Sequence, residues 1–255
     1  MEVDLGDLLG AVTDKGRRHH RNEDSMAVGA LEDGTRIAVV CDGVSSSSRS
    51  DEASQAAADA AYAVLSGSSL AVADALVAAA AAAQAAVVAL GTTAGEEAPS
   101  CTFVAAVVTA DQGSCTVGWL GDSRAYLVGS SVMALTEDDS WATEAVASGQ
   151  VTLAEAMADS RAHQITRWLA ADAPSIIPRT ATFALTEPAL VLVVSDGLWN
   201  YLNDNDHLGS LVGKETDRTP VQLARDLCVF ANEAGGHDNI TVAVLPVRPT
   251  SGVAS

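Results

Sequence analysis

The sequence predicts an α+β fold in which antiparallel sheets are covered by helices on their outer faces. Apolar runs of strand length occur in pairs and threes along the 255 residues, and segments with helical spacing occur in pairs between them. The regular alternation of strand and helix that builds a parallel sheet is absent. A chain of this length with 48% hydrophobic and 18% charged residues can bury a substantial core in one domain.

Eight segments are expected to form strands, because many of them alternate small and branched side chains and end in Gly, Asp or Asn. They are residues 8–12, 36–41, 101–109, 115–120, 125–128, 181–185, 190–195 and 240–245. Helical spacing predicts six helices, at residues 51–65, 70–90, 141–148, 153–159, 162–169 and 221–233. The last helix has the clearest start signal, since Thr219 can cap it and Pro220 suits its first turn.

We expect a single domain over residues 1–248 and a loose tail at 249–255. Residues 136–173 are polar and helical and separate two groups of strands, so they are expected to form a small flap inserted into the domain. Residues 91–100 are expected to form a flexible loop. Residues 70–90 are long and apolar enough to cross a bilayer, but Asp74 and Gln84 interrupt the run and no Lys or Arg flanks it. A soluble helix packed on a sheet is therefore expected, without membrane association.

Charge and cysteine usage indicate the setting in which the chain works. The formal net charge of −19 at pH 7 argues against binding nucleic acid or an anionic membrane through a general electrostatic surface. The four cysteines lie in apolar segments and form no C-x-x-C pair, so buried, reduced thiols are expected. The acidic N-terminus lacks the plan of a signal peptide. We therefore expect a cytoplasmic protein.

Five short acidic signatures follow one another along the chain. They are T-D-K-G…R-N-E-D at 13–24, V-V-C-D-G at 39–43, G-W-L-G-D-S-R at 118–124, V-V-S-D-G-L-W at 193–199 and G-G-H-D-N at 235–239. Each places an aspartate at the end of an apolar run or in a glycine-containing turn, where the backbone holds the carboxylate still. Carboxylate and carbonyl oxygens suit Mg²⁺ or Mn²⁺ better than zinc. If the fold gathers them, these signatures predict a carboxylate-held metal centre.

In order and spacing, the five blocks resemble the motifs of bacterial metal-dependent protein serine/threonine phosphatases of type 2C, the PPM family. The resemblance covers about residues 9–246, nearly the whole chain. It implies a four-layer α-β-β-α sandwich with two central antiparallel sheets and a binuclear metal centre at one end. It further implies hydrolysis of phosphoserine and phosphothreonine in proteins by a metal-activated water, with Mn²⁺ or Mg²⁺ in two tight sites.

The resemblance also gives each matching residue a role. Asp42 is expected to bridge the two metals, and Asp196 and Asp238 are expected to bind the first of them. These three aspartates form the implied catalytic set. Gly43 is expected to offer its backbone carbonyl to the second metal. Two such ions lower the pKa of a bridging water and bind phosphoryl oxygens, so the protein needs no covalent intermediate.

Two further aspartates complete the implied metal set. Asp24 is expected to be a metal-shell carboxylate, acting directly or through water, and Asp122 matches the carboxylate of a third, weaker site in bacterial members. Cys41 lies next to Asp42, but a nucleophilic role is not expected for a thiol on a buried strand.

The chain departs from the family's pattern at two places. Most members carry a phosphate-binding arginine about five residues before the terminal aspartate of the first block, and here that position is His19. Either His19 or one of the neighbouring Arg17 and Arg18 is expected to bind the substrate phosphate. Val44 stands where animal members often carry a histidine proposed as general acid. The proton for the leaving group must therefore come from metal-bound water, from His19 or from another group.

Other functions remain open on the sequence. The main alternative is a pseudo-phosphatase that binds a phosphoprotein or signalling partner without turnover, and another is a phosphatase for small phospho-compounds. If the chain is an enzyme of signal transduction, its partners are phosphorylated proteins that are targets of Ser/Thr kinases. His237 either orients Asp238 or faces solvent. Trp199 is expected to anchor a helix in the core.

Overall fold

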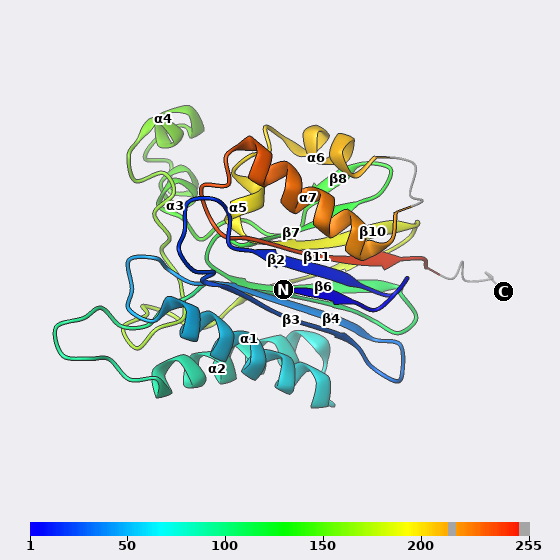
Figure 1. The fold of residues 1–255 in the computed structure, drawn as a ribbon, viewed down its shortest axis with the longest axis horizontal. Coiled ribbons are helices and arrows are strands. Elements are labelled where there is room, and N and C mark those ends of the chain that lie inside the picture. Colours follow the sequence, from blue (N-terminus) through cyan, green and yellow to red (C-terminus); the bar gives the residue numbers. More distant parts are fainter. Residues whose placement is uncertain (214–217, 250–255) are drawn as a thin grey trace.

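Two antiparallel sheets lie face to face, and helices cover both outer faces (Figure 1). The structure, a computed structural model, describes residues 1–213 and 218–249. The four layers confirm the predicted α-β-β-α sandwich. The predicted tail from residue 250 onward lies outside the described residues.

The first sheet contains six strands in the order β1-β2-β11-β10-β7-β8. They are β1 (Glu2–Asp4), β2 (Gly10–Asp14), β11 (Ile240–Val247), β10 (Ala189–Val194), β7 (Arg124–Val128) and β8 (Val132–Ala134). Helix α7 (Pro220–Ala234) packs across β2 and β11 on the outer face. As predicted, Thr219 caps α7; a capping box with Gln222 completes its N-terminus.

The second sheet contains five strands in the order β3-β4-β5-β6-β9. They are β3 (Asp24–Ala30), β4 (Arg36–Asp42), β5 (Phe103–Val108), β6 (Ser114–Leu120) and β9 (Arg179–Ala184). Strand β4 shows how alternation builds the layers. Its Ile37, Val39 and Cys41 pack toward the helices, whereas Ala38 and Val40 pack toward the other sheet.

Two antiparallel helices, α1 (Ser50–Gly67) and α2 (Val72–Ala89), cover the second sheet (Figure 1). Among the described residues, α2 alone is long and apolar enough to cross a bilayer by length and composition. Its buried side chains pack against α1 and the sheet. Alanine dominates this face because a small side chain lets the two helices and the sheet approach closely.

Three strands, β1, β3 and β8, and two short helices, α5 (Asp196–Trp199) and α6 (Asn205–Val212), were not predicted. The helix predicted at 162–169 is wrong. There Leu169 exchanges backbone hydrogen bonds with Cys101, and Thr166 N donates to the Asp139 carbonyl. The backbone groups that a helix would use internally are therefore committed to other segments.

The predicted flap contains helices α3 (Trp141–Ala147) and α4 (Leu153–Ala158) with a small core of their own around Ala142, Ala156 and Ala162. Asp139 fastens the base of the flap to the sandwich. Its fully buried carboxylate accepts a hydrogen bond from Gly121 N and lies 2.8 Å from Nε of Arg179. The flap is thus a separate packing unit attached next to the end of β6.

Candidate metal centre

The fold brings five aspartates of the predicted metal set to one end of the sandwich. Asp24 begins β3 and Asp42 ends β4, and the two are direct partners in the antiparallel register. Asp122 follows β6, Asp196 follows β10, and Asp238 precedes β11. Burial, and then negative charge from the other four aspartates, raises the pKa of Asp42 well above its ordinary value.

Asp24 is the most deeply buried member of this group. Burial raises the pKa of Asp24 from 3.8 to about 6, although hydrogen bonds to its charged form oppose the shift. Its Oδ2 accepts hydrogen bonds from Thr241 Oγ1 and Ser195 Oγ, both at 2.7 Å. The carboxyl group is therefore held in one orientation by Thr241 in β11 and by Ser195, which directly follows β10.

Asp42 is held by the segment that follows the loop at 91–100. Its backbone N donates to Thr102 Oγ1 at 3.0 Å, and its carbonyl accepts from Thr102 N at 2.7 Å. Burial and then the charge of Asp24 raise the pKa of Asp42 well above its ordinary value. At Gly43 any Cβ would meet the carbonyl oxygens of Glu23 and Ser50 at 2.7 Å, so only glycine allows the chain to turn here.

Asp122 lies between β6 of the second sheet and β7 of the first, and Asp196 follows β10 of the first sheet. Burial, followed by the charge of Asp138, raises the pKa of Asp122 to about 7. Burial, followed by the charge of Asp122, raises the pKa of Asp196 well above its ordinary value. Trp199 Nε1 donates to the Asp122 carbonyl at 2.8 Å, and the buried indole anchors α5 as predicted. Helix α5 thus places Asp196 beside Asp122.

Asp238 lies in the turn before β11. Its Oδ1 accepts a hydrogen bond from Asn239 N at 2.8 Å and lies 3.2 Å from His19 Nε2. Gly16 adopts a φ of +70°, and a Cβ on it would overlap the Asp238 carbonyl oxygen. Glycine at this position therefore lets the loop after β2 reach the turn that carries Asp238.

The basic cluster, Arg17 to Arg21, is fastened to the same turn. Asn239 Nδ2 donates to the carbonyls of Lys15 and Arg21, at 2.8 and 3.1 Å. Arg17 N donates to the Gly236 carbonyl at 2.8 Å, and an Arg18 guanidinium nitrogen lies 3.4 Å from His237 Nε2. The structure therefore places the cluster beside Asp238.

His237 does not simply face solvent. The Tyr201 hydroxyl lies 2.8 Å from His237 Nδ1 and also accepts a hydrogen bond from His237 N at 2.8 Å. The two rings are nearly parallel, with their centroids 6.1 Å apart. This double contact ties the turn before β11 to the segment after α5, so Tyr201 helps to orient Asp238 through its neighbour.

The carboxylate group has the chemistry of a cation site, although it does not form a closed ligand shell. Within residues 1–213 and 218–249, no three His, Cys, Asp or Glu side chains converge as a preformed metal-binding set. However, buried Oδ1 atoms of Asp24 and Asp196 lack a hydrogen-bond partner within those ranges. Asp42 is the direct register partner of Asp24, and after burial the charges of Asp24 and Asp196 contribute most to the raised pKa of Asp42. A hard divalent cation would satisfy these oxygens and offset their repulsion.

The model of the protein phosphatase 2C family matches residues 13–222, most of the chain. This chain belongs to the protein phosphatase 2C family. Like the serine/threonine phosphatases among its similar proteins, this chain is a protein serine/threonine phosphatase. A serine/threonine phosphatase, stp, of Listeria monocytogenes is 29% identical over 240 residues, which span 91% of this chain and 93% of the relative.

Solved phosphatases share the fold of this phosphatase closely. The PPM Ser-Thr phosphatase MsPP of Mycobacterium smegmatis, solved in complex with cacodylate, has a TM-score of 0.77 and 28% identity, covering 93% of this chain and 97% of MsPP. The catalytic domain of the phosphatase PstP, solved in complex with two manganese ions, has a TM-score of 0.73 and 26% identity. That alignment covers 94% of this chain and 97% of PstP.

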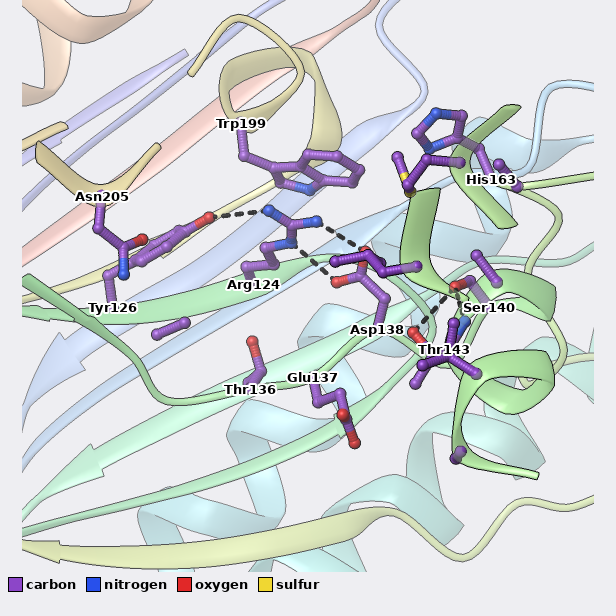
Figure 2. Close-up of a pocket in the computed structure, with 17 residues that line it drawn as sticks. Arg124, Tyr126, Thr136, Glu137, Asp138, Ser140, Thr143, His163, Trp199 and Asn205 are labelled. Carbon is purple, nitrogen blue, oxygen red and sulfur yellow. Dashed lines mark hydrogen bonds and ion pairs between the residues drawn. The ribbon is translucent and has the colours of Figure 1, made fainter. Parts of the chain in front are cut away.

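In this phosphatase, Arg124 of the G-D-S-R block has a structural role that was not predicted. It lies at a cavity of about 560 Å³ between the flap helices and β7 (Figure 2). Its guanidinium donates to both Asp138 carboxylate oxygens at 2.8 Å and lies 3.6 Å from the ring centroid of Trp199. Because Asp138 neutralises its charge, Arg124 supports the flap and α5 rather than a substrate phosphate.

Several residues that hold the aspartates were also missed. They are Ser195, Thr241, Thr102 and Asn239. Each is a small polar residue inside or beside an otherwise apolar strand, and that position was the available signal. A buried hydroxyl or amide in such a place must find a partner, and here the partner is an aspartate or the loop that carries one.

Proposed function

We propose that this phosphatase hydrolyses phosphoserine and phosphothreonine in proteins by attack of a metal-activated water at a binuclear Mn²⁺ or Mg²⁺ centre. The observation that supports this proposal is the pair of unpartnered carboxylate oxygens on Asp24 and Asp196 beside Asp42. Three buried acids with raised pKa values are costly unless a cation or protons accompany them. The manganese ions in PstP are consistent with the cation.

The aspartates at this end of the sandwich and the Gly43 carbonyl would hold the ions. Asp42 would bridge the ions, Asp196 and Asp238 would bind the first, and the Gly43 carbonyl would face the second. When bound, the ions supply Lewis acidity that activates water and offsets charge on the phosphoryl group. Ser195 and Thr241 keep the Asp24 carboxyl turned toward this set through their 2.7 Å hydrogen bonds. Asp122 would serve a third, weaker site.

Arg17, Arg18 or His19 in the basic cluster is proposed to receive the substrate phosphate. Arg18→Ala is expected to lower kcat/KM for a phosphopeptide by about one to two decades, mainly by raising KM, because a charge-assisted hydrogen bond is worth about 1.5–3 kcal/mol. Steady-state kinetics of Arg17→Ala, Arg18→Ala and His19→Ala would measure this effect. Arg21→Ala is the control, since Arg21 pairs with Asp51 at 3.2 Å.

The assignment of phosphate binding to the cluster has a clear point of failure. If all three substitutions leave kcat/KM within about twofold of the parent, the cluster only balances neighbouring carboxylates. His19 Nε2 lies 3.2 Å from Asp238 Oδ1, so His19→Ala tests a second role, protonation of the leaving group. In that case kcat would fall while KM stays the same.

The partners proposed are phosphorylated proteins that are targets of Ser/Thr kinases, and the location proposed is the cytoplasm. The four cysteines are free and buried, which suits a reducing compartment. The formal net charge of −19 disfavours nucleic acid and anionic membrane surfaces as partners.

The proposed function is tested by turnover of p-nitrophenyl phosphate and of phosphoserine and phosphothreonine peptides with Mn²⁺, with Mg²⁺ and with EDTA. We expect hydrolysis of both substrate classes with either metal and none with EDTA, because uncatalysed phosphomonoester hydrolysis is extremely slow. Turnover that persists in EDTA would contradict metal dependence. Tight binding of phosphopeptides without turnover would favour a pseudo-phosphatase instead.

A further inference from the structure

A second cavity, of about 480 Å³, lies between the flap, the loop at 91–100 and the segment that follows Gly43. We call it the flanking cavity. Its apolar wall includes Val44, Ala98, Ile165 and the half-buried indole of Trp168. None of these residues has a role in the metal centre described above.

The flanking cavity adjoins the catalytic end of the sandwich through the backbone. Val44 directly follows Gly43, and Val44 N donates to the Ser100 carbonyl at 3.0 Å. Ser48 Oγ donates to the Glu97 carbonyl at 2.7 Å and holds the loop at 91–100 against the same segment. A peptide with its phosphate at the metal centre would therefore have its neighbouring residues close to this cavity.

The formal charges that line the flanking cavity at pH 7 are negative, with His163, which also lines it, counted as neutral. Glu97 and Asp172 contribute exposed carboxylates, and no Lys or Arg lies on the wall among the described residues. Arg167, next to Trp168 in sequence, is engaged elsewhere: a guanidinium nitrogen donates to the Ile177 carbonyl at 2.5 Å, and another lies 3.7 Å from Asp139. Among the described residues, no Lys or Arg on the cavity wall therefore neutralises the two carboxylates.

We propose that the flanking cavity binds a lysine or arginine side chain of the substrate, close in sequence to the phosphorylated residue. The apolar wall suits the aliphatic stem of such a side chain, and the Trp168 ring suits its cation. Glu97 and Asp172 provide the opposite charge. This inference rests on the proposed function, because it names the class of phosphopeptide that the same site prefers.

The charge of the whole chain strengthens the argument. At a formal net charge of −19, the protein repels a phosphomonoester dianion at a distance. A basic residue beside the phosphate offsets that repulsion during approach and then gains a complementary pocket on binding. The basic cluster lies in the loop after β2, beside the turn that carries Asp238, where it would bind the phosphate itself. The cation on the protein and the cation on the substrate therefore have different roles.

The experiment compares phosphoserine peptides that differ at one flanking position. Lysine, arginine, alanine or glutamate is placed at each position within about three residues of the phosphoserine, a reach of roughly 10 Å in an extended chain. We expect kcat/KM for the best lysine or arginine peptide to exceed that of its alanine counterpart by about tenfold, with less difference at high salt. Turnover of p-nitrophenyl phosphate reports the proposed function separately.

A charge-reversed variant assigns the preference to the cavity. Glu97→Lys, and separately Asp172→Lys, should bring the ratio of kcat/KM between basic and alanine peptides close to one. Glu32→Lys is the matched control, because Glu32 is an exposed acid in the β3–β4 hairpin, at the other end of β4 from Asp42. It changes the net charge equally and should leave the ratio as it is in the parent.

Binding supplies a readout that does not require turnover. Fluorescence anisotropy with non-hydrolysable phosphonate peptides should give the same order of preference as kinetics. Equal affinity and equal kcat/KM for basic and alanine peptides would overturn this inference while leaving phosphatase activity intact. A preference that survives both charge reversals would overturn it too, since the selectivity would then arise outside the flanking cavity.

Discussion

Asp42→Asn is expected to lower kcat/KM for every phosphomonoester by about three decades or more, because the loss of a shared metal ligand removes several kcal/mol of charge stabilisation. The protein should remain folded. Asparagine keeps the size of the side chain, and the backbone hydrogen bonds to Thr102 are unaffected. Removing one of five clustered negative charges also relieves repulsion, so the metal-free variant should melt at or above the parent's temperature.

Calorimetric titration with Mn²⁺ and thermal denaturation together check this expectation. Asp33→Asn is the control: Asp33 lies in the β3–β4 hairpin at the far end of β4, where it accepts a hydrogen bond from Thr35 N that asparagine can also accept. Asp238→Ala should behave like Asp42→Asn. Near-parental turnover of either variant at ordinary Mn²⁺ concentration would remove that residue from the metal set.

The layered fold was predictable because its strands and long helices carry strong periodic signals. The side chains of β4 alternate between two core clusters, and Thr219 and Pro220 mark the start of α7. In contrast, β3 contains small and polar residues and becomes a strand through its pairing with β4. Sheet edges such as β1 and β8 are only three residues long, too short for a periodic signal.

The helix predicted at 162–169 failed because tertiary pairing overrode local spacing. Ala162 and Leu169 are buried, but Leu169 pairs with Cys101 and Ile165 pairs with Ser140. No pattern within the segment reveals those distant partners. The same limit applies to the cavities, which form where the flap meets residues far away in the chain.

The aspartates were found from sequence because each stands at a strand end or turn that an apolar run defines. The groups that orient them were harder to find. Ser195 and Thr241 reach Asp24 from the opposite sheet, and the register between β10 and β11 is needed to place them. Likewise, the Tyr201–His237 contact joins residues 36 positions apart in sequence. Motifs therefore identify the acids, and only the fold shows what holds them.

The metal-free protein is expected to lose stability as the pH rises from about 4 to about 7. Burial raises the pKa of Asp24 from 3.8 to about 6 and that of Asp122 to about 7. Between the unfolded and folded pKa values the native state binds more protons, so the free energy of unfolding falls with increasing pH. For Asp24 alone the shift corresponds to on the order of 3 kcal/mol, present below about pH 4 and lost above about pH 6.

Melting temperatures measured in EDTA across this pH range would show the fall in stability with rising pH. Saturating Mn²⁺ should make that fall smaller. The cation compensates the ionised carboxylates, so its stabilising effect should be largest at the alkaline end. Asp122→Asn should reduce the slope in EDTA, because the amide cannot ionise, whereas Asp33→Asn should leave it as in the parent. A melting temperature in EDTA that stays level or rises over this range would mean that the buried aspartates are not the source of the protein's need for a cation.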